Sequence, residues 1–247
     1  MNTTIQIIPF ARLALTIIPV LIVITILFRW ALNYHNALYA ISRMLVQLLL
    51  IGYFLSYIFG AQKPWIVLAV LTVMLLASSW IALRTIKTRR RVLYRQALIS
   101  IAVGGGLTLL LVTQGVLDLQ PWYWPRYLIP LAGMIFASAM NSVSLAAERF
   151  YAEIERKVDY THARGIAFRA SLIPITNSLF AVGLVSLPGM MTGQILSGIS
   201  PLIAARYQIM VMCMIFGSAG ISSALFLQFI TQLDVDMDPS EIDGNLV

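Results

Sequence analysis

The first residues that could do chemistry are Arg43 and Gln47, a polar pair inside a long apolar stretch. Because they are four residues apart, they share one face of a helix. Arg43 either extends its charged end to lipid headgroups or faces a cavity and lines a path. Gln47 has less reach, and an unpaired amide in hydrocarbon costs several kcal/mol. Both residues are therefore candidates for a substrate pathway.

A second polar group follows Pro174, where Thr176, Asn177 and Ser178 come in succession. Proline removes a backbone donor, and nearby hydroxyl groups can satisfy the carbonyl that it frees. Such side chains either hold helices together or line a pathway, and the sequence favours neither interpretation. The same holds for Asn141 in the preceding apolar stretch. We include Asn177 and Asn141 among the pathway candidates.

The segment 188–194, with the sequence Pro-Gly-Met-Met-Thr-Gly-Gln, combines a helix stop with two glycines. Irregular backbone at membrane depth persists only where protein covers it or water reaches it. We therefore expect a break or re-entrant turn that lines a cavity, with an ordinary helix end as the alternative. The pathway candidates in this segment are Pro188, Gly189, Met190, Met191 and Gly193.

Sulfur-bearing side chains cluster where Met210, Met212 and Met214 flank Cys213. Soft sulfur ligands suit Cu(I), but methionine is also a flexible filler of apolar cores, and we favour packing here. A single cysteine in an apolar run is expected to be a small buried side chain. The two histidines, His35 and His162, lie in predicted connections and form no metal constellation. The sequence therefore assigns no metal ligand and no cofactor.

Three absences narrow the function further. The predicted membrane spans contain no Asp or Glu, which disfavours a proton- or sodium-coupled antiporter. The chain has no Gly-x-x-x-x-Gly-Lys-Ser/Thr sequence, so it cannot cradle the phosphates of ATP. No nucleophile, base and orienting group cluster as an enzyme would need. We expect a protein that is not an enzyme, and any ATP hydrolysis must occur in another chain.

The elements that position these residues follow from the composition. Of the 247 residues, 60% are hydrophobic and 11% are charged, whereas soluble domains have about 25% charged residues. A bilayer core about 30 Å thick needs about 20 helical residues. Seven stretches qualify or nearly do: 8–30, 38–59, 64–83, 96–112, 127–147, 170–187 and 207–232. The predicted fold class is all-α, a polytopic membrane helix bundle of about seven spans.

The distribution of Lys and Arg predicts the orientation. Of 17 such residues, 13 fall in one set of alternate connections, and positively charged short loops stay in the cytoplasm. This places the N-terminus outside and the C-terminus in the cytoplasm. The bias also explains the net charge of +7 without a nucleic-acid partner. Tryptophans at the ends of the stretches are typical of a lipid interface; they are Trp30, Trp65, Trp80, Trp122 and Trp124.

We expect a single transmembrane domain over residues 1–231 and a short acidic tail, 232–247, that is disordered. The largest polar connection inside the domain covers residues 148–169. It is predicted to begin as an extension of the fifth helix, stabilised by an i,i+4 pair between Glu153 and Lys157. Gly165 is expected to interrupt that helix.

Four segments, 47–59, 128–134, 182–193 and 201–210, carry a resemblance to a known family. They resemble the FetB-type iron-export ABC permeases, which are related to plant aluminium-tolerance ABC membrane subunits. The Leu-Pro-Gly-Met-Met sequence at 187–191 is the most specific part. The resemblance implies a multi-pass subunit of the bacterial inner membrane, present as a homodimer with two copies of a cytoplasmic ABC ATPase, that exports iron.

By this resemblance the ATPase would engage the connection 148–169, and the helix beyond Pro174 would transmit the motion. The candidate coupling residues are Glu153, Arg156, Lys157, Arg164, Gly165 and Arg169. The connection lacks the Leu-Gly-Ala-Thr-bearing segment that family members commonly carry. That difference leaves two alternatives open, an ATP-independent channel or carrier and a scaffold that transports nothing. Iron rests on the resemblance alone.

Overall fold

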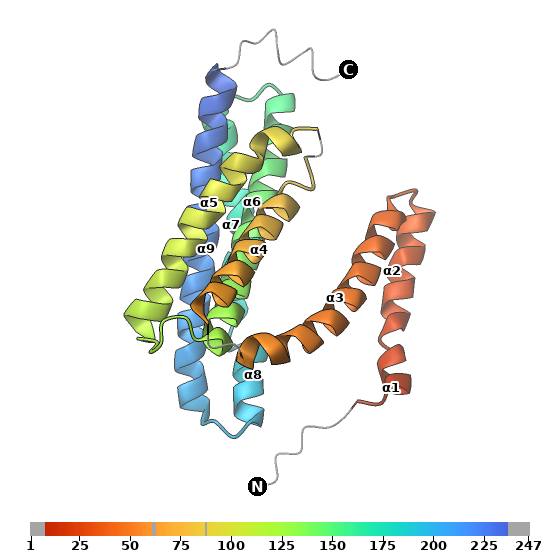
Figure 1. Cartoon of the computed structure of the whole chain (residues 1–247). Helices are drawn as coiled ribbons and strands as arrows, with labels where there is room; N and C mark the ends of the chain where they lie inside the picture. Colours follow the sequence, from red (N-terminus) through yellow and green to blue (C-terminus); the bar gives the residue numbers. More distant parts are fainter. Residues whose placement is uncertain (1–7, 61–62, 87, 237–247) are drawn as a thin grey trace. The chain divides into compact units, whose positions relative to one another are not determined.

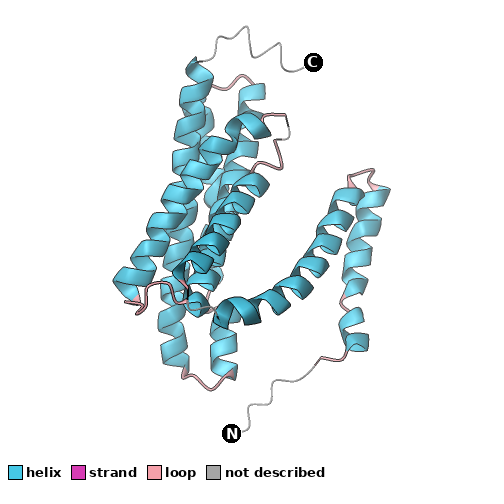
Figure 2. Ribbon diagram, viewed as in Figure 1, coloured by secondary structure: helices cyan, strands magenta, loops and turns pink. Residues whose placement is uncertain are grey.

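The computed structural model describes residues 8–60, 63–86 and 88–236. The elements in these residues are all helical, apart from an isolated bridge between Val182 and Ser186 (Figure 2). The chain forms two compact units, residues 1–61 and residues 62–247. The all-helical prediction is confirmed.

The first unit contains three helices, α1 (Phe10–Ala14), α2 (Ile17–Arg29) and α3 (Tyr34–Gly60). Helix α2 packs against α3, and none of the residues of α2 is buried. Such predominantly apolar, exposed helices suit a lipid environment, because their backbone groups are satisfied internally. Arg43 and Gln47 lie exposed on α3.

The second unit is a bundle in which α6 occupies the central position (Figure 1). Its elements are α4 (Pro64–Ala82), α5 (Arg90–Leu110), the π-helical turn η1 (Leu111–Val116), α6 (Pro125–Glu155), α7 (Tyr160–Ala181), α8 (Gly189–Leu196) and α9 (Pro201–Asp236). Helix α6 packs against α4, α5, α7 and α9, and α9 also packs against α5, α7 and α8. The core therefore lies around α6 and α9, where Ile135, Phe150 and Phe226 are fully buried.

Helices α5 and α9 approach each other closely at Gly104. A Cβ atom on Gly104 would lie 2.7 Å from the backbone nitrogen of Ser222 and would also overlap the Ser222 hydroxyl. Lipid provides no hydrophobic force between helices, so small residues that allow close backbone approach are how such helices pack. Glycine at this position is required by the packing.

The connections of the second unit divide between its two ends. Figure 1 shows the α4–α5 and α6–α7 connections at the same end as the end of α9. The α8–α9 connection lies at the opposite end. The α4–α5 corner is fixed by Arg90, whose Nη2 and Nε donate to the Trp80 carbonyl at 2.7 and 3.1 Å. The Arg90 guanidinium also lies 3.7 Å from the centre of the Trp80 ring, a favourable cation–π contact. The most basic connections thus share one end.

Six helices of the described residues are long and apolar enough to cross a membrane, in agreement with a polytopic bundle. They are Ala11–Arg29, Tyr34–Gly60, Pro64–Ala82, Arg90–Val116, Pro125–Glu155 and Pro201–Ile230. The predicted stretch 170–187 is not among them. There α7 begins ten residues earlier with a polar segment and ends at Ala181, and the chain resumes as the separate helix α8.

The connection between α6 and α7 is shorter than predicted, and Gly165 does not interrupt a helix. Helix α6 ends at Glu155 and α7 begins at Tyr160. The Asp159 carboxylate starts α7 by accepting from the backbone nitrogens of Thr161 at 3.0 Å and His162 at 3.4 Å. An N-cap of this kind stabilises a helix by about 1 kcal/mol, which is comparable to the cost of about 1 kcal/mol for a glycine within it.

The predicted pair between Glu153 and Lys157 is also wrong. Glu153 Oε1 instead accepts from Arg149 at 2.7 Å and from Arg156 at 3.3 Å. Lys157 has a φ of 60° and lies beyond the last residue of α6, so it does not follow Glu153 on the same helix face. An i,i+4 pair requires both residues to be helical.

Helix α9 continues to Asp236, so residues 232–236 of the predicted tail are helical. Residues 237–247, which make up the rest of that tail, lie outside the described residues.

Candidate functional site

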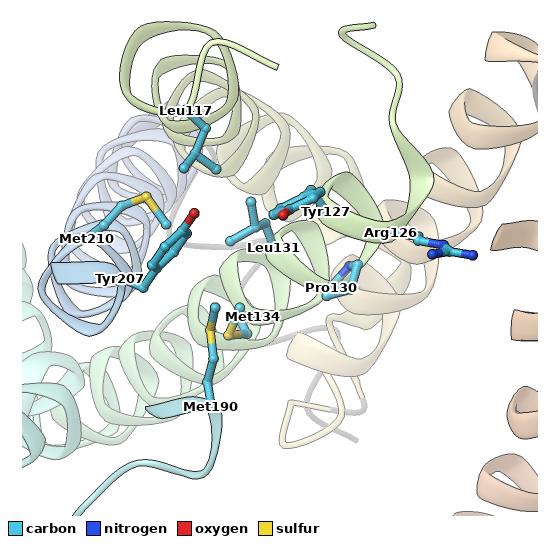
Figure 3. Close-up of a pocket in the computed structure, with 9 residues that line it drawn as sticks. All are labelled: Leu117, Arg126, Tyr127, Pro130, Leu131, Met134, Met190, Tyr207 and Met210. Atoms are coloured by element: carbon cyan, nitrogen blue, oxygen red, sulfur yellow. The ribbon is translucent and has the colours of Figure 1, made fainter. Parts of the chain in front are cut away.

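A cavity of about 350 Å³ lies where the start of α6 meets α8 and the start of α9. It is lined by Leu117, Arg126, Tyr127, Pro130, Leu131, Met134, Met190, Tyr207 and Met210. Figure 3 shows Tyr207 and Met210 on one side, Met134 and Met190 next to each other in this view, and Arg126 pointing away from them. We call this the outer cavity because the predicted orientation places it toward the outside.

A second cavity of about 340 Å³ lies between α6, α7 and α9. Its lining residues are Met134, Ala137, Ser138, Asn141, Ser142, Leu145, Ser171, Pro174, Ile175, Ser178, Val211, Ile215 and Ala219. Met134 lines both cavities, so the two adjoin at this residue. We call the second one the central cavity.

One face of α6 contributes to both cavities. Six of its lining residues follow one another at steps of four and three: Tyr127, Leu131, Met134, Ser138, Asn141 and Leu145. This spacing keeps them on one side of a helix. At 1.5 Å per residue, the segment from Tyr127 to Leu145 is about 27 Å long, close to the bilayer core of about 30 Å. The two cavities therefore follow α6 through most of that depth.

The serine hydroxyls of the central cavity all donate to backbone carbonyls. Their bonds are Ser138 to the Ile215 carbonyl at 3.0 Å, Ser142 to the Ser171 carbonyl at 3.4 Å, Ser171 to the Phe168 carbonyl at 2.8 Å, and Ser178 to the Pro174 carbonyl at 3.0 Å. Two of these bonds join α6 to α9 and to α7. Hydroxyls of this kind hold membrane helices together.

The Asn141 side chain differs from these serines. It is exposed, it lines the central cavity, and no hydrogen bond joins its amide to the described part of the chain. An amide carries both donors and an acceptor. Asn141 is therefore a polar side chain of this cavity whose donors and acceptor are not used in hydrogen bonds to the described part of the chain, and they can bind a solute.

The predicted pathway residues fall into three groups. Asn141 lines the central cavity and Met190 the outer one. Asn177 is exposed next to the lining residue Ser178, and Pro188, Gly189, Met191 and Gly193 are at or in α8 without lining either cavity. Arg43 and Gln47 belong to the first unit, so their role in a pathway stays a prediction.

The interruption of the sixth stretch lies earlier than expected. It covers residues 182–188, where Gly183 has a φ of 83° and Val182 pairs with Ser186. Pro188, with extended backbone, then precedes the helical residues Gly189–Leu196. The two glycines of the predicted break are thus helical. The broken helix still brings Met190 to the outer cavity.

Sequence reasoning missed Tyr127, Met134 and Tyr207 as lining residues. The four-and-three spacing along α6 was a signal that could have found the first two, because it selects one helix face. Met210, which we interpreted as a core residue, lines the outer cavity. Met212 and Met214 are buried as expected, but Cys213, expected to be buried, is exposed.

The described residues contain no group of three or more His, Cys, Asp or Glu side chains that could hold a metal ion. Any metal bound by these cavities would therefore have to use other ligands.

The candidate coupling residues gather where α6 ends and α7 begins. Glu153 is only 4% exposed and holds both Arg149 and Arg156. Arg164 on α7 donates to Gln228 Oε1 of α9 at 2.8 Å. The Arg164–Gln228 bond thus joins the start of α7 to the C-terminal part of α9, whereas the two ion pairs of Glu153 lie within the end of α6. Lys157 and Arg169 are exposed.

Residues 10–233 match the family described as "Uncharacterised protein family (UPF0014)". The chain is 37% identical over 216 residues to the UPF0014 membrane protein slr1647 of Synechocystis sp., which covers 79% of this chain and 83% of that protein. It is 34% identical over 229 residues to the "Probable iron export permease protein FetB" of Escherichia coli, which covers 86% of each.

A plant relative matches as well. The chain is 35% identical over 202 residues to the protein ALUMINUM SENSITIVE 3 of Arabidopsis thaliana, which covers 75% of this chain and 72% of that protein. No solved structure matches the chain.

Proposed function

The chain belongs to the UPF0014 family of membrane proteins, and we propose that it is the membrane-spanning permease subunit of an ABC-type exporter of iron or another metal. In this proposal it lies in the inner membrane with its N-terminus outside. Two copies work with two copies of a separate cytoplasmic ATPase. The relative named as an iron export permease supports the substrate class, and the missing phosphate-binding loop supports the separate ATPase.

The observation that carries the proposal is the pair of adjoining cavities along α6. They share Met134, and the central one presents the uncommitted amide of Asn141. A permease needs a route whose polar groups can bind a solute and release it, rather than groups fixed in packing. Asn141 meets that requirement, and we place Asn177 on the same route; Arg43 and Gln47 remain candidate pathway residues of the first unit.

The geometry suggests how a motor outside the membrane could act on these cavities. Helix α6 runs from Pro125 to Glu155, so the helix that lines both cavities also carries the buried Glu153. A displacement of the α6–α7 connection would therefore be transmitted along α6. In α7, Pro174 lines the central cavity, and a proline lacks the backbone donor that would stiffen the helix there. Bending at this point would change the width of the central cavity.

Affinity purification of the chain in mild detergent tests the partner. We expect a stoichiometric second chain that carries a Gly-x-x-x-x-Gly-Lys-Ser/Thr sequence and hydrolyses ATP. Cellular iron, measured by elemental analysis after iron loading, is expected to be lower in cells that produce the chain. Isolation without any ATPase in several detergents, together with unchanged metal content, would contradict the proposal.

Asn141→Leu tests the route in the same metal-content assay. A hydrogen bond contributes about 0.5–1.5 kcal/mol, so its loss is expected to weaken export about two- to tenfold. Cys213→Ser is the control, because Cys213 is exposed on α9 and lines neither cavity. Equal export by Asn141→Leu and the control, at equal amounts of protein in the membrane, would remove Asn141 from the route.

A second candidate function is supported by the short α6–α7 connection. Only residues 156–159 separate the two helices, which leaves no room for an additional coupling helix between them. An ATP-independent channel or carrier needs no such element. Flux by the purified chain in ATP-free vesicles would favour this function, whereas a scaffold would give no flux with or without ATP and partner.

A further inference from the structure

Three methionines line the outer cavity, and each comes from a different helix. Met134 belongs to α6, Met190 to α8 and Met210 to α9. They are separated in sequence by 56 and 20 residues, so the fold and not a local motif brings them to one cavity. The close-up in Figure 3 shows their side chains around the same space.

The other lining groups of this cavity do not favour a hard metal ion. No Asp, Glu or His contributes to it. The Arg126 side chain points away from the three methionines (Figure 3), so its positive charge is directed elsewhere. Hard divalent ions prefer oxygen and imidazole ligands, whereas soft thioethers select Cu(I). The rings of Tyr127 and Tyr207 add aromatic surface, which attracts cations.

We propose that Met134, Met190 and Met210 form a thioether site for a soft monovalent cation, Cu(I). Methionine has three rotatable bonds and a polarisable sulfur, so the three side chains can close around an ion much smaller than the cavity of about 350 Å³. Thioethers are neutral, and a monovalent ion leaves only one charge to be stabilised. The proposal deepens the proposed function, on which it rests for transport, by naming a soft class of metal.

Binding of Ag(I) to the purified full chain tests the site, because Ag(I) is a soft monovalent ion that is not oxidised in air. The measurement is equilibrium dialysis in chloride-free buffer with elemental analysis. All variants carry Cys213→Ser, since Cys213 is an exposed free thiol that would bind Ag(I) by itself. We compare Met134→Leu, Met190→Leu and Met210→Leu, which keep side-chain volume nearly unchanged.

Met212→Leu is the matched control. Met212 lies two residues from Met210 on the same helix, is buried, and lines neither cavity. Loss of a residue that only supports a metal ligand already lowers metal affinity about 10–100-fold. Each cavity variant, which loses a ligand itself, is therefore expected to lower the affinity for one equivalent of Ag(I) at least about tenfold. The control is expected to keep that equivalent, and Fe(II) at the same concentration is not expected to displace it.

Retention of the equivalent in all three cavity variants, or its equal loss in the control, would overturn the proposal. NMR of methionine methyl groups labelled with 13C gives an independent measurement, in which binding is observed on the Cys213→Ser chain with all its methionines in place. Ag(I) is expected to shift the resonances of Met134, Met190 and Met210 and to leave that of Met212 in place. Shifts confined to other methionines would equally refute the site.

Failure of this proposal and failure of the proposed function can be told apart. The binding assay uses the chain alone and needs neither ATP nor a partner. Absence of Ag(I) binding together with a copurifying ATPase and export of iron would reject the thioether site and keep the permease. Ag(I) binding without any ATPase partner would keep the site and reject the ABC-type mechanism.

Discussion

Single substitutions are expected to change the stability of this protein most at closely packed positions. Gly104 faces the backbone of Ser222 at the crossing of α5 and α9. Gly106 is on the same helix, and a Cβ atom there would meet nothing within 4 Å. Substituting each of these two glycines by alanine therefore distinguishes the effect of close packing on stability from the effect of helix propensity.

Gly104→Ala is expected to lower the melting temperature of the purified chain. The added methyl group forces α5 and α9 apart, and overpacking costs about 1–3 kcal/mol, more than the gain of about 1 kcal/mol in helix propensity. Gly106→Ala is expected to leave the melting temperature unchanged or to raise it. A higher melting temperature for Gly104→Ala would show that the two helices are not in close contact.

Glu153 is the second residue of this kind, a buried carboxylate between two arginines. Glu153→Gln is expected to destabilise the chain by about 1–2 kcal/mol. Hydrogen bonds to charged groups contribute about 1.5–3 kcal/mol, and solvent screening reduces that value here, because Arg149 and Arg156 are 41% and 65% exposed. Thermal unfolding in detergent measures the effect, and Glu155→Gln, at an exposed position, is expected to have little. Equal unfolding temperatures for both variants would contradict the role given to Glu153.

At the scale of elements, the interruption between α7 and α8 is the feature with the clearest structural requirement. Gly183 has a φ of 83°, in the left-handed region that other residues avoid. The turn that follows brings α8, and with it Met190, to the outer cavity. A helix that continued without interruption past Ala181 would remove this turn.

Gly183→Ala is expected to destabilise the second unit by about 1–2 kcal/mol, the cost of a left-handed conformation for a residue with a Cβ atom. Gly217→Ala on α9 is the matched change, since Gly217 has ordinary helical backbone and open space around it. Gly217→Ala is expected to stabilise the second unit, because alanine favours a helix interior. Thermal unfolding of both variants checks the difference in sign, and a stabilising Gly183→Ala would mean that the turn is not needed.

At the scale of the whole molecule, the orientation in the membrane decides which end of the bundle can meet a cytoplasmic motor. The α4–α5 and α6–α7 connections share one end of the second unit (Figure 1). Short basic loops are retained in the cytoplasm. We therefore expect this end, with Glu153 and its two arginines, to face the proposed ATPase.

Cysteine labelling of intact cells tests this orientation in a Cys213→Ser background. Ser200→Cys, in the α8–α9 connection, is expected to react with a membrane-impermeant maleimide added outside. Arg91→Cys, in the first turn of α5, is expected to react only after the membrane is opened. Both positions are exposed. Reaction of Arg91→Cys in intact cells would invert the orientation and place the motor contacts on the wrong side.

The hydropathy pattern alone was enough to predict an all-helical membrane protein and the positions of most of its helices. In lipid every backbone group must be satisfied within the segment, so an apolar run of sufficient length can only form a helix. Six predicted stretches correspond, for this reason, to the six helical segments that are long and apolar enough to cross a membrane. The remaining stretch, 170–187, is interrupted after Ala181: α7 begins earlier, with the polar segment from Tyr160, and ends before the turn at Gly183.

Which residues share a cavity, and which are committed to packing, became known only from the folded chain. Asn141 and Ser138 are both polar residues on α6, but the Ser138 hydroxyl bonds to α9 whereas the Asn141 amide lines a cavity without such a bond. Met134, Met190 and Met210 likewise meet only in the folded chain. Lipid provides no hydrophobic driving force between helices, which associate through complementary shapes and small residues. Hydropathy therefore does not specify which helix faces meet.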